Sequence, residues 1–81
     1  MTILPAQCRA ARALIDLSQK ELAELAGVSW RTILSFESEQ RQPIRATMAA
    51  LQRALETAGV EFTNGDQPGV RLAKKRNPKR P

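Results

Sequence analysis

The chain has 81 residues, of which 42% are hydrophobic and 4% aromatic. This length is enough for one small domain but not for two independent hydrophobic cores. Histidine is absent and cysteine occurs once, which argues against Ser-His and Cys-His catalytic pairs, histidine or four-cysteine metal sites and intramolecular disulfides. We therefore expect no enzymatic activity, no metal ion and no cofactor. The lack of a long apolar run and of a signal-peptide pattern predicts a cytoplasmic protein.

The net charge of +5 is unevenly distributed. Residues 1–73 carry eight basic and eight acidic side chains, so the whole surplus comes from Lys74, Lys75, Arg76, Lys79 and Arg80. The sequence thus predicts a neutral folded body followed by a basic, disordered tail at 74–81. From composition alone, this tail is either a nonspecific DNA-binding arm or a solubilising segment.

The apolar spacing predicts four helices. The first spans about 5–16. The second is capped by Ser18 in the capping box Ser18-Gln19-Lys20-Glu21 and runs to Ala26, with Gly27 following it. Ser29 caps a third helix over about 30–38, and a fourth spans about 44–58 before Gly59. The expected buried positions of the first and last helices are Leu4, Cys8, Ala11, Ile15, Met48, Leu51, Leu55 and Ala58.

Two short segments at 60–63 and 70–72 alternate apolar and polar residues around a run of turn formers at 64–69. This pattern predicts a β-hairpin, with its register left open by the long turn. Its apolar residues are candidates for a dimer interface, because an exposed hairpin edge is a template for pairing with a second copy. These residues are Val60, Phe62, Val70 and Leu72.

The third helix has two distinct faces. At about 100° per residue, Ile33 and Phe36 point inward, whereas Arg31, Leu34, Ser35 and Ser38 point outward with Trp30 beside them. An exposed arginine, an aromatic ring and hydroxyls on one helix face suit the major groove of DNA, which admits an α-helix and displays the base edges.

The segment SQKELAELAGVSWRTILSFE (18–37) resembles the helix-turn-helix of the Cro and lambda-repressor type, the xenobiotic-response-element family of bacterial and phage regulators. The resemblance covers roughly residues 5–62. It depends on many positions at once, namely Arg12, Leu17, Ser18, Gln19, Leu22, Ala23, Gly27, Val28, Ile33 and Glu37. It implies an all-α bundle of four helices at 1–59 that binds DNA, followed here by the β-hairpin at 60–73 and the tail.

The resemblance also implies roles for individual residues. Gln19 would bind a backbone phosphate, and Arg12 and Glu37 would form a structural ion pair. Base edges would be read from Ser29, Trp30, Arg31 and Ser35, with Arg31 best placed to bind guanine. Phosphate contacts would come from Ser38, Arg41, Gln42 and Arg45. Trp30 departs from the common pattern, and it either packs against protein, stacks on a sugar or contacts a thymine methyl group.

These features together predict a transcriptional regulator, with repression by a homodimer on a pseudo-palindromic operator as the preferred mechanism. One alternative is an antitoxin or other interaction module whose main partner is another protein. A second is a general nucleic-acid binder that acts through its tail.

Overall fold

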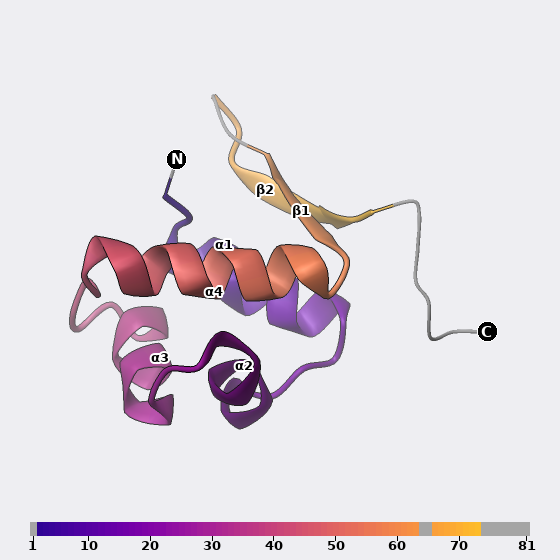
Figure 1. Ribbon diagram of the computed structural model, residues 1–81. Helices are drawn as coiled ribbons and strands as arrows, with labels where there is room; N and C mark the ends of the chain where they lie inside the picture. The colour runs from indigo at the N-terminus through magenta and orange to yellow at the C-terminus, as the bar shows by residue number, and fades with distance from the viewer. Residues whose placement is uncertain (1, 64–65, 74–81) are drawn as a thin grey trace.

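The computed structural model describes residues 2–63 and 66–73. It contains four helices, α1 (Pro5–Leu14), α2 (Gln19–Ala26), α3 (Trp30–Glu37) and α4 (Arg45–Thr57), followed by the antiparallel strands β1 (Val60–Thr63) and β2 (Gly69–Leu72) (Figure 1). The expected helices and hairpin are therefore confirmed, with ends that differ by one or two residues. The basic tail lies outside the described residues. Within them, every helix is too short or too polar to cross a bilayer.

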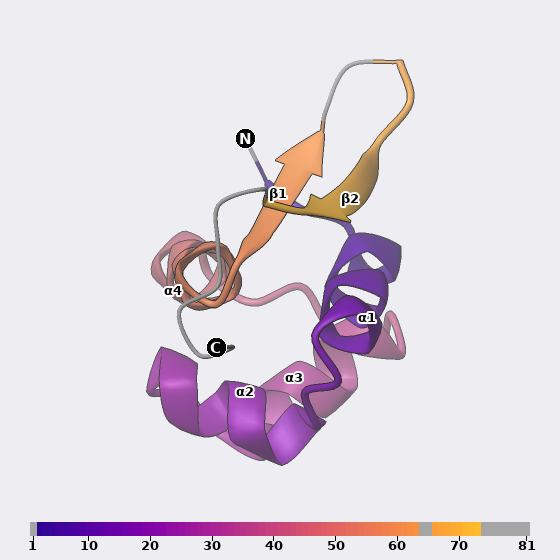
Figure 2. The same ribbon diagram turned by 90° about the vertical axis from the view of Figure 1, so that its right-hand side faces the viewer.

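The elements form three tiers (Figures 1 and 2). Helices α1 and α4 make the middle tier, and the hairpin packs on both of them from one side. On the other side α2 packs against α4 and α3, and α3 also contacts α1. The short glycine turn between α2 and α3 prevents these helices from lying side by side, so α3 is left with one face toward solvent.

The core is built from aliphatic residues around Phe36. Its buried members are Ile3, Cys8, Ala11, Leu22, Ala23, Ile33, Phe36, Met48, Leu51, Leu55 and Val60. Two expected core positions are wrong, because Leu4 is 48% exposed and Ala58 is exposed as well. Leu4 has extended backbone angles, so successive side chains there alternate and Ile3 points inward instead. Ala58 is the residue directly after Thr57, the last residue of α4, and its methyl group faces solvent there.

The hairpin belongs to the same core. The register pairs Val60 with Leu72 and Phe62 with Val70, and Phe62 and Val70 pack against the buried cluster. The buried side chain of Gln7 also ties α1 to the turn end of the hairpin. Its Nε2 donates to the carbonyl oxygens of Thr63 (3.1 Å) and Gly69 (3.0 Å), and its Oε1 accepts from the Leu4 amide (2.8 Å). Gln7 thus hydrogen-bonds three backbone groups and joins the start of α1 to both strands.

Each helix is followed by a residue with left-handed backbone: Asp16 (φ 56°), Gly27 (φ 72°), Glu39 (φ 63°) and Gly59 (φ 109°). After α3 the Glu39 amide donates to the Phe36 carbonyl (3.0 Å) and the Gln40 amide to the Ser35 carbonyl (2.9 Å). This is the hydrogen-bond pattern of a Schellman motif, in which glycine is the favoured left-handed residue.

Glu39→Gly is therefore expected to stabilise the fold by up to about 1 kcal/mol, because relief of the left-handed conformation exceeds the added chain entropy. The ion pair that Glu39 forms with Arg9 (3.9 Å) is exposed and contributes little. Urea denaturation followed by circular dichroism measures the change. Gln40→Gly is the matched control, because Gln40 has negative φ and glycine there should only destabilise. Equal destabilisation by both substitutions would contradict the prediction.

Candidate nucleic-acid interface

The two helices of the central motif begin at side-chain caps. The Ser18 hydroxyl accepts from the Glu21 amide (3.0 Å), while the Glu21 carboxylate accepts from the Ser18 amide (2.9 Å). Gly27 then ends α2 with the Val28 amide donating to the Ala23 carbonyl (3.0 Å). The Ser29 hydroxyl caps α3 by accepting from the Thr32 amide (3.4 Å). These local bonds define where α3 begins and so which of its residues point outward.

A buried carboxylate, Glu37, joins α3 to α1 and α2. Its Oε1 accepts from Arg12 Nη2 (2.7 Å) and Gln19 Nε2 (3.0 Å), and its Oε2 accepts from Arg12 Nε (2.7 Å) and Cys8 Sγ (3.2 Å). Arg12 Nη1 also donates to the Leu17 carbonyl (3.0 Å), and Arg9 donates to the Glu37 carbonyl. The ion pair that the resemblance implied is thus one part of a larger network, which fixes α3 against both preceding helices.

Protonation in this network follows from burial and hydrogen bonding. Burial alone would raise the pKa of Glu37, but the hydrogen bonds from Arg12, Gln19 and Cys8 outweigh it and lower the pKa below its ordinary value. The pKa of the Cys8 thiol is raised, mainly by burial and to a smaller extent by its hydrogen bond to Glu37. Cys8 therefore remains a protonated donor and Glu37 a charged acceptor.

Gln19 connects this buried network to the surface. Its Oε1 accepts from Trp30 Nε1 (3.1 Å), and its Nε2 donates one hydrogen to Glu37. The second Nε2 hydrogen has no acceptor among the described residues and stays available to a phosphate. The Lys20 ammonium lies 4.9 Å from the centre of the Trp30 ring, a cation–π contact of about 0.5–1 kcal/mol at an exposed site. Trp30 therefore packs against α2 through its polar edge and one ring face.

The outward face of α3 matches the expected division of its residues. Ile33 and Phe36 are buried, whereas Arg31 is exposed and Leu34 is 43% exposed. Ser35 is half-buried. The Ser38 hydroxyl donates to the Leu34 carbonyl (2.8 Å), so its hydrogen is used at the end of α3. Ser29 and Ser38 thus serve first as helix-end residues, and Arg31 offers the most accessible cationic group on this face.

A shallow groove of about 310 Å³ separates α3 from the start of α4. It is lined by Arg31, Thr32, Ser35, Arg41, Pro43, Ile44 and Thr47. Three expected site residues, Arg31, Ser35 and Arg41, therefore meet here, and the groove adds the hydroxyls of Thr32 and Thr47. Helix α4 begins at this groove without a side-chain cap, so its first amides and its positive dipole end face the same region.

Sequence reasoning missed Thr32 and Thr47. Thr32 belongs to neither of the two faces predicted for α3, and Thr47 lies on a helix for which the sequence predicts only the buried stripe. A hydroxyl in the first turn of α4, directly after the basic loop, is the signal that could have identified Thr47. Among the residues that the structure describes, no three His, Cys, Asp or Glu side chains gather as a metal site.

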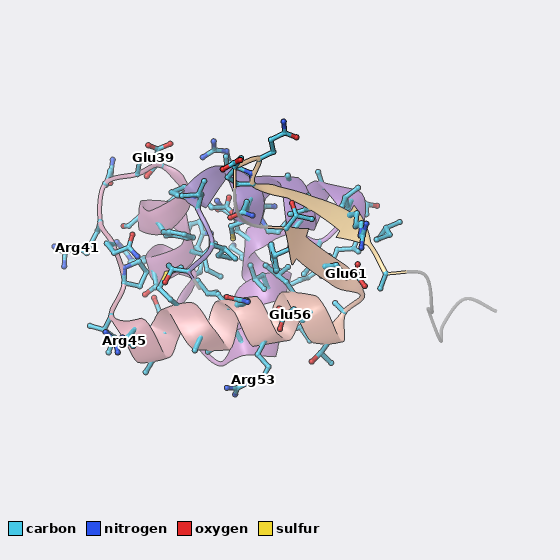
Figure 3. All side chains as sticks on the ribbon, turned by 90° about the horizontal axis from the view of Figure 1, so that it is seen from above. Glu39, Arg41, Arg45, Arg53, Glu56 and Glu61 are labelled. Atoms are coloured by element: carbon cyan, nitrogen blue, oxygen red, sulfur yellow. The ribbon has the colours of Figure 1, made fainter. Side chains whose placement is uncertain are left out.

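Basic side chains occupy the end of the molecule where the α3–α4 loop turns (Figure 3). Arg41 and Arg45 both project outward there. Glu39 lies at the same end, where it pairs with Arg9, whereas Glu56 and Glu61 lie toward the hairpin end. Gln42 is exposed in the same loop. A body with balanced charges therefore has a basic end next to α3, where its potential attracts an anionic partner.

The dimer-interface candidates differ in accessibility. Val60 is 1% exposed inside its own core, which corrects its assignment to an interface. Phe62 and Val70 are half-buried against that core, whereas Leu72 is 54% exposed at the end of β2. A hydrophobic residue that closes the monomer's core cannot also pair across a symmetry axis without opening it. Leu72 is thus the accessible member of the set.

Comparison with known proteins agrees with this geometry. The helix-turn-helix family model matches residues 9–62, which contain the capped α2, the glycine turn, α3 and α4. No curated protein sequence matches the chain. The matched segment covers two-thirds of the chain and coincides with the structural motif. The chain therefore belongs to the Cro and lambda-repressor type helix-turn-helix family of DNA-binding transcription regulators.

Proposed function

We propose that this protein is a sequence-specific transcriptional repressor that binds a pseudo-palindromic operator as a homodimer. The observation that carries the proposal is the position of Arg31. It is exposed on the outward face of α3, one residue from the start of that helix, and it lines the groove that leads to Arg41. The second helix of such a motif enters the major groove with its N-terminal residues at the base edges.

Base readout is assigned to three residues at the start of α3 and one further along its outward face: Ser29, Trp30, Arg31 and Ser35. The Arg31 guanidinium can donate to both major-groove acceptors of guanine, N7 and O6. No hydrogen bond or ion pair within the described residues engages its side chain. Ser29 and Ser35 contribute hydroxyls, which accept or donate to several bases. We therefore assign guanine recognition to Arg31.

Phosphate binding is assigned to groups on both sides of α3. On one side are Gln19, through its remaining Nε2 hydrogen, and the first amides of α2. On the other side are Arg41, Gln42 and Arg45, together with the uncapped start of α4. Ser38 joins them only if its hydroxyl turns away from the Leu34 carbonyl, to which it now donates. Phosphate contacts fix the register of a protein on the duplex, and helix N-termini bind anions readily. These groups would hold α3 in the groove.

A single recognition helix reads too few base pairs to select a site in a genome. We therefore propose a twofold dimer that places two copies of α3 about 34 Å apart on one face of the DNA. The exposed Leu72 and the open hairpin edges are the surface we assign to this contact. Repression would follow because the bound dimer occludes polymerase at a promoter.

In-vitro selection from random duplexes, followed by footprinting at physiological salt, tests this proposal. We expect an inverted repeat with half-site centres about one helical turn apart. Binding without an enriched motif would contradict sequence-specific recognition. A tight complex with another protein that survives high salt, with DNA affinity at the nonspecific level, would favour the interaction-module alternative.

The phosphate assignments predict the salt dependence of binding. Arg41→Ala and Arg45→Ala should weaken all selected duplexes about equally. Each substitution should also reduce the slope of log K against log salt by about 2, because the dimer carries it twice and neutralises two phosphates fewer. Arg53→Ala is the matched control, because Arg53 is an exposed arginine on α4 that lies eight residues, about two helical turns, beyond Arg45 (Figure 3). An unchanged slope in both variants would remove these two residues from the interface.

A further inference from the structure

Trp30 is the single tryptophan of the chain and the first residue of α3, with 41% of its surface exposed. Its indole N–H already donates to Gln19 Oε1 at 3.1 Å. An indole ring has one hydrogen-bond donor and no acceptor. The accessible part of Trp30 therefore has no polar atom left to read a base by hydrogen bonding, although it lies where base edges are approached.

The surroundings of the ring narrow what it can do. The Lys20 ammonium lies over the ring, 4.9 Å from its centre, so a sugar cannot stack on that face without displacing Lys20. Leu34, which is 43% exposed, lies one turn further along α3 on the same side. The start of the recognition helix thus presents two accessible hydrophobic side chains next to the cationic Arg31.

The orientation of the ring is also fixed. Gln19 is held by Glu37 at 3.0 Å, and Glu37 is held by Arg12 and Cys8. The indole is therefore oriented through Gln19 by a buried network rather than by solvent. A side chain fixed before binding loses less conformational entropy in the complex.

We propose that Trp30, with Leu34 beside it, is a specificity-determining residue that recognises the C5-methyl group of a pyrimidine in the major groove. The inference rests on the proposed function and names one base feature that this site reads. The methyl group is the apolar element that the major groove offers, and it distinguishes thymine from other bases. The same group is present in 5-methylcytosine, so the experiment separates these two sources.

The probes are the duplexes recovered by in-vitro selection, remade with deoxyuridine at one thymidine position at a time. At one position of each half-site, we expect the deoxyuridine duplex to bind about fourfold more weakly than the thymidine duplex. This is the effect of losing the burial of one methyl group. In a parallel set, 5-methylcytosine replaces each cytosine. A loss at thymine assigns the methyl to thymine, and a gain at cytosine assigns it to 5-methylcytosine. Either result supports the proposal.

Variants link the effect to the ring. Trp30→Ala should bind thymine and uracil duplexes equally, whereas Trp30→Phe, which keeps an apolar ring, should retain a preference for the methyl group. Leu25→Ala is the matched control and should keep the methyl preference of the unmodified protein. Leu25 is also an exposed leucine (59%), but it lies on α2 and lines a separate groove between α2 and α4. Thermal melting of Trp30→Ala and Trp30→Phe establishes that each variant is folded.

Equal affinity of the unmodified protein for methylated and unmethylated duplexes at every position would overturn the inference. A methyl preference that persists in Trp30→Ala would overturn it as well. In both cases the proposed function would still hold if Arg31→Ala weakens binding to the selected duplexes. Selection without an enriched motif would instead overturn the proposed function and this inference together.

Discussion

Arg12→Ala is expected to destabilise the protein by about 3–5 kcal/mol, because it leaves the Glu37 carboxylate buried without its cationic partner. The Glu37 side chain is 3% exposed and that of Arg12 is 20% exposed. Gln19 and Cys8 would remain as neutral donors, which cannot replace two charge-assisted hydrogen bonds. Since small domains are stabilised by only about 5–15 kcal/mol, this loss removes a large share. Urea denaturation followed by circular dichroism measures it.

The hairpin offers a matched control for this variant. Arg71 Nε lies 2.7 Å from Glu61 Oε1, the same distance as in the buried pair, but these side chains are 70% and 48% exposed. Arg71→Ala should therefore change the free energy of unfolding by at most about 1 kcal/mol. The double variant Arg12→Met/Glu37→Leu should recover much of the stability, because it removes both charges together. Equal costs for Arg12→Ala and Arg71→Ala would contradict the importance of burial.

The same network predicts a pH dependence. The folded state lowers the pKa of Glu37, so Glu37 binds protons more weakly in the folded than in the unfolded protein. Its contribution to stability is complete above the unfolded pKa of about 4.3 and is lost as the pH falls through the lower folded value. Glu37→Gln should remove this component, so the stability difference from the unmodified protein should shrink on acidification. A constant difference between pH 7 and pH 3 would contradict the assignment.

Local signals made most of the fold predictable. The capping box at Ser18, the cap at Ser29 and the glycines at 27 and 59 are chain-local features, and the ends of three helices follow from them. The left-handed residues Asp16 and Glu39 carry no such signal, because neither is glycine. The predicted end of α1 is consequently two residues too late, and the predicted end of α3 is one residue too late.

Long-range pairings were not predictable in the same way. Gln7 is a polar residue at the start of α1, yet it is buried because it meets hairpin carbonyls 56 and 62 residues away in sequence. The hairpin likewise closes over α1 and α4, which buries Val60. An alternating pattern indicates which face of a strand is apolar, but not whether a second copy or the monomer's own helices cover it.

The candidate site shows the same division. The outward position of Arg31 follows from the phase of α3, which its buried residues determine. The resemblance implied that Gln19 binds phosphate and that Arg12 and Glu37 pair. The connection of Gln19 to both Glu37 and Trp30 required the relative placement of α2 and α3. The groove at Thr47 required the path of the α3–α4 loop. The apolar spacing in the sequence thus predicts the outward face of α3, whereas the residues that lie beside this face follow only from the packing of the helices.

Arg31→Ala is expected to weaken binding to a selected duplex by about 1–3 kcal/mol for each half-site, roughly 5- to 150-fold, and to relax base preference at one position per half-site. The physical reason is that alanine removes a donor pair that no other residue of α3 can supply. Arg31 is exposed and unpaired within the described residues, so its removal should change the free energy of unfolding by no more than about 0.5 kcal/mol. Fluorescence anisotropy with the selected duplex and its single-base variants measures the change in affinity and in base preference.

Two controls separate this prediction from binding by charge alone. Arg53→Ala removes the same charge from α4, outside the groove that Arg31 lines, and it should leave affinity and base preference nearly unchanged. Deletion of residues 74–81 removes the five surplus basic side chains. If binding requires the tail and tolerates Arg31→Ala, the protein is a nonspecific binder that uses its basic segment. If the tail deletion weakens all duplexes equally and Arg31→Ala alone changes the preferred base, readout belongs to α3.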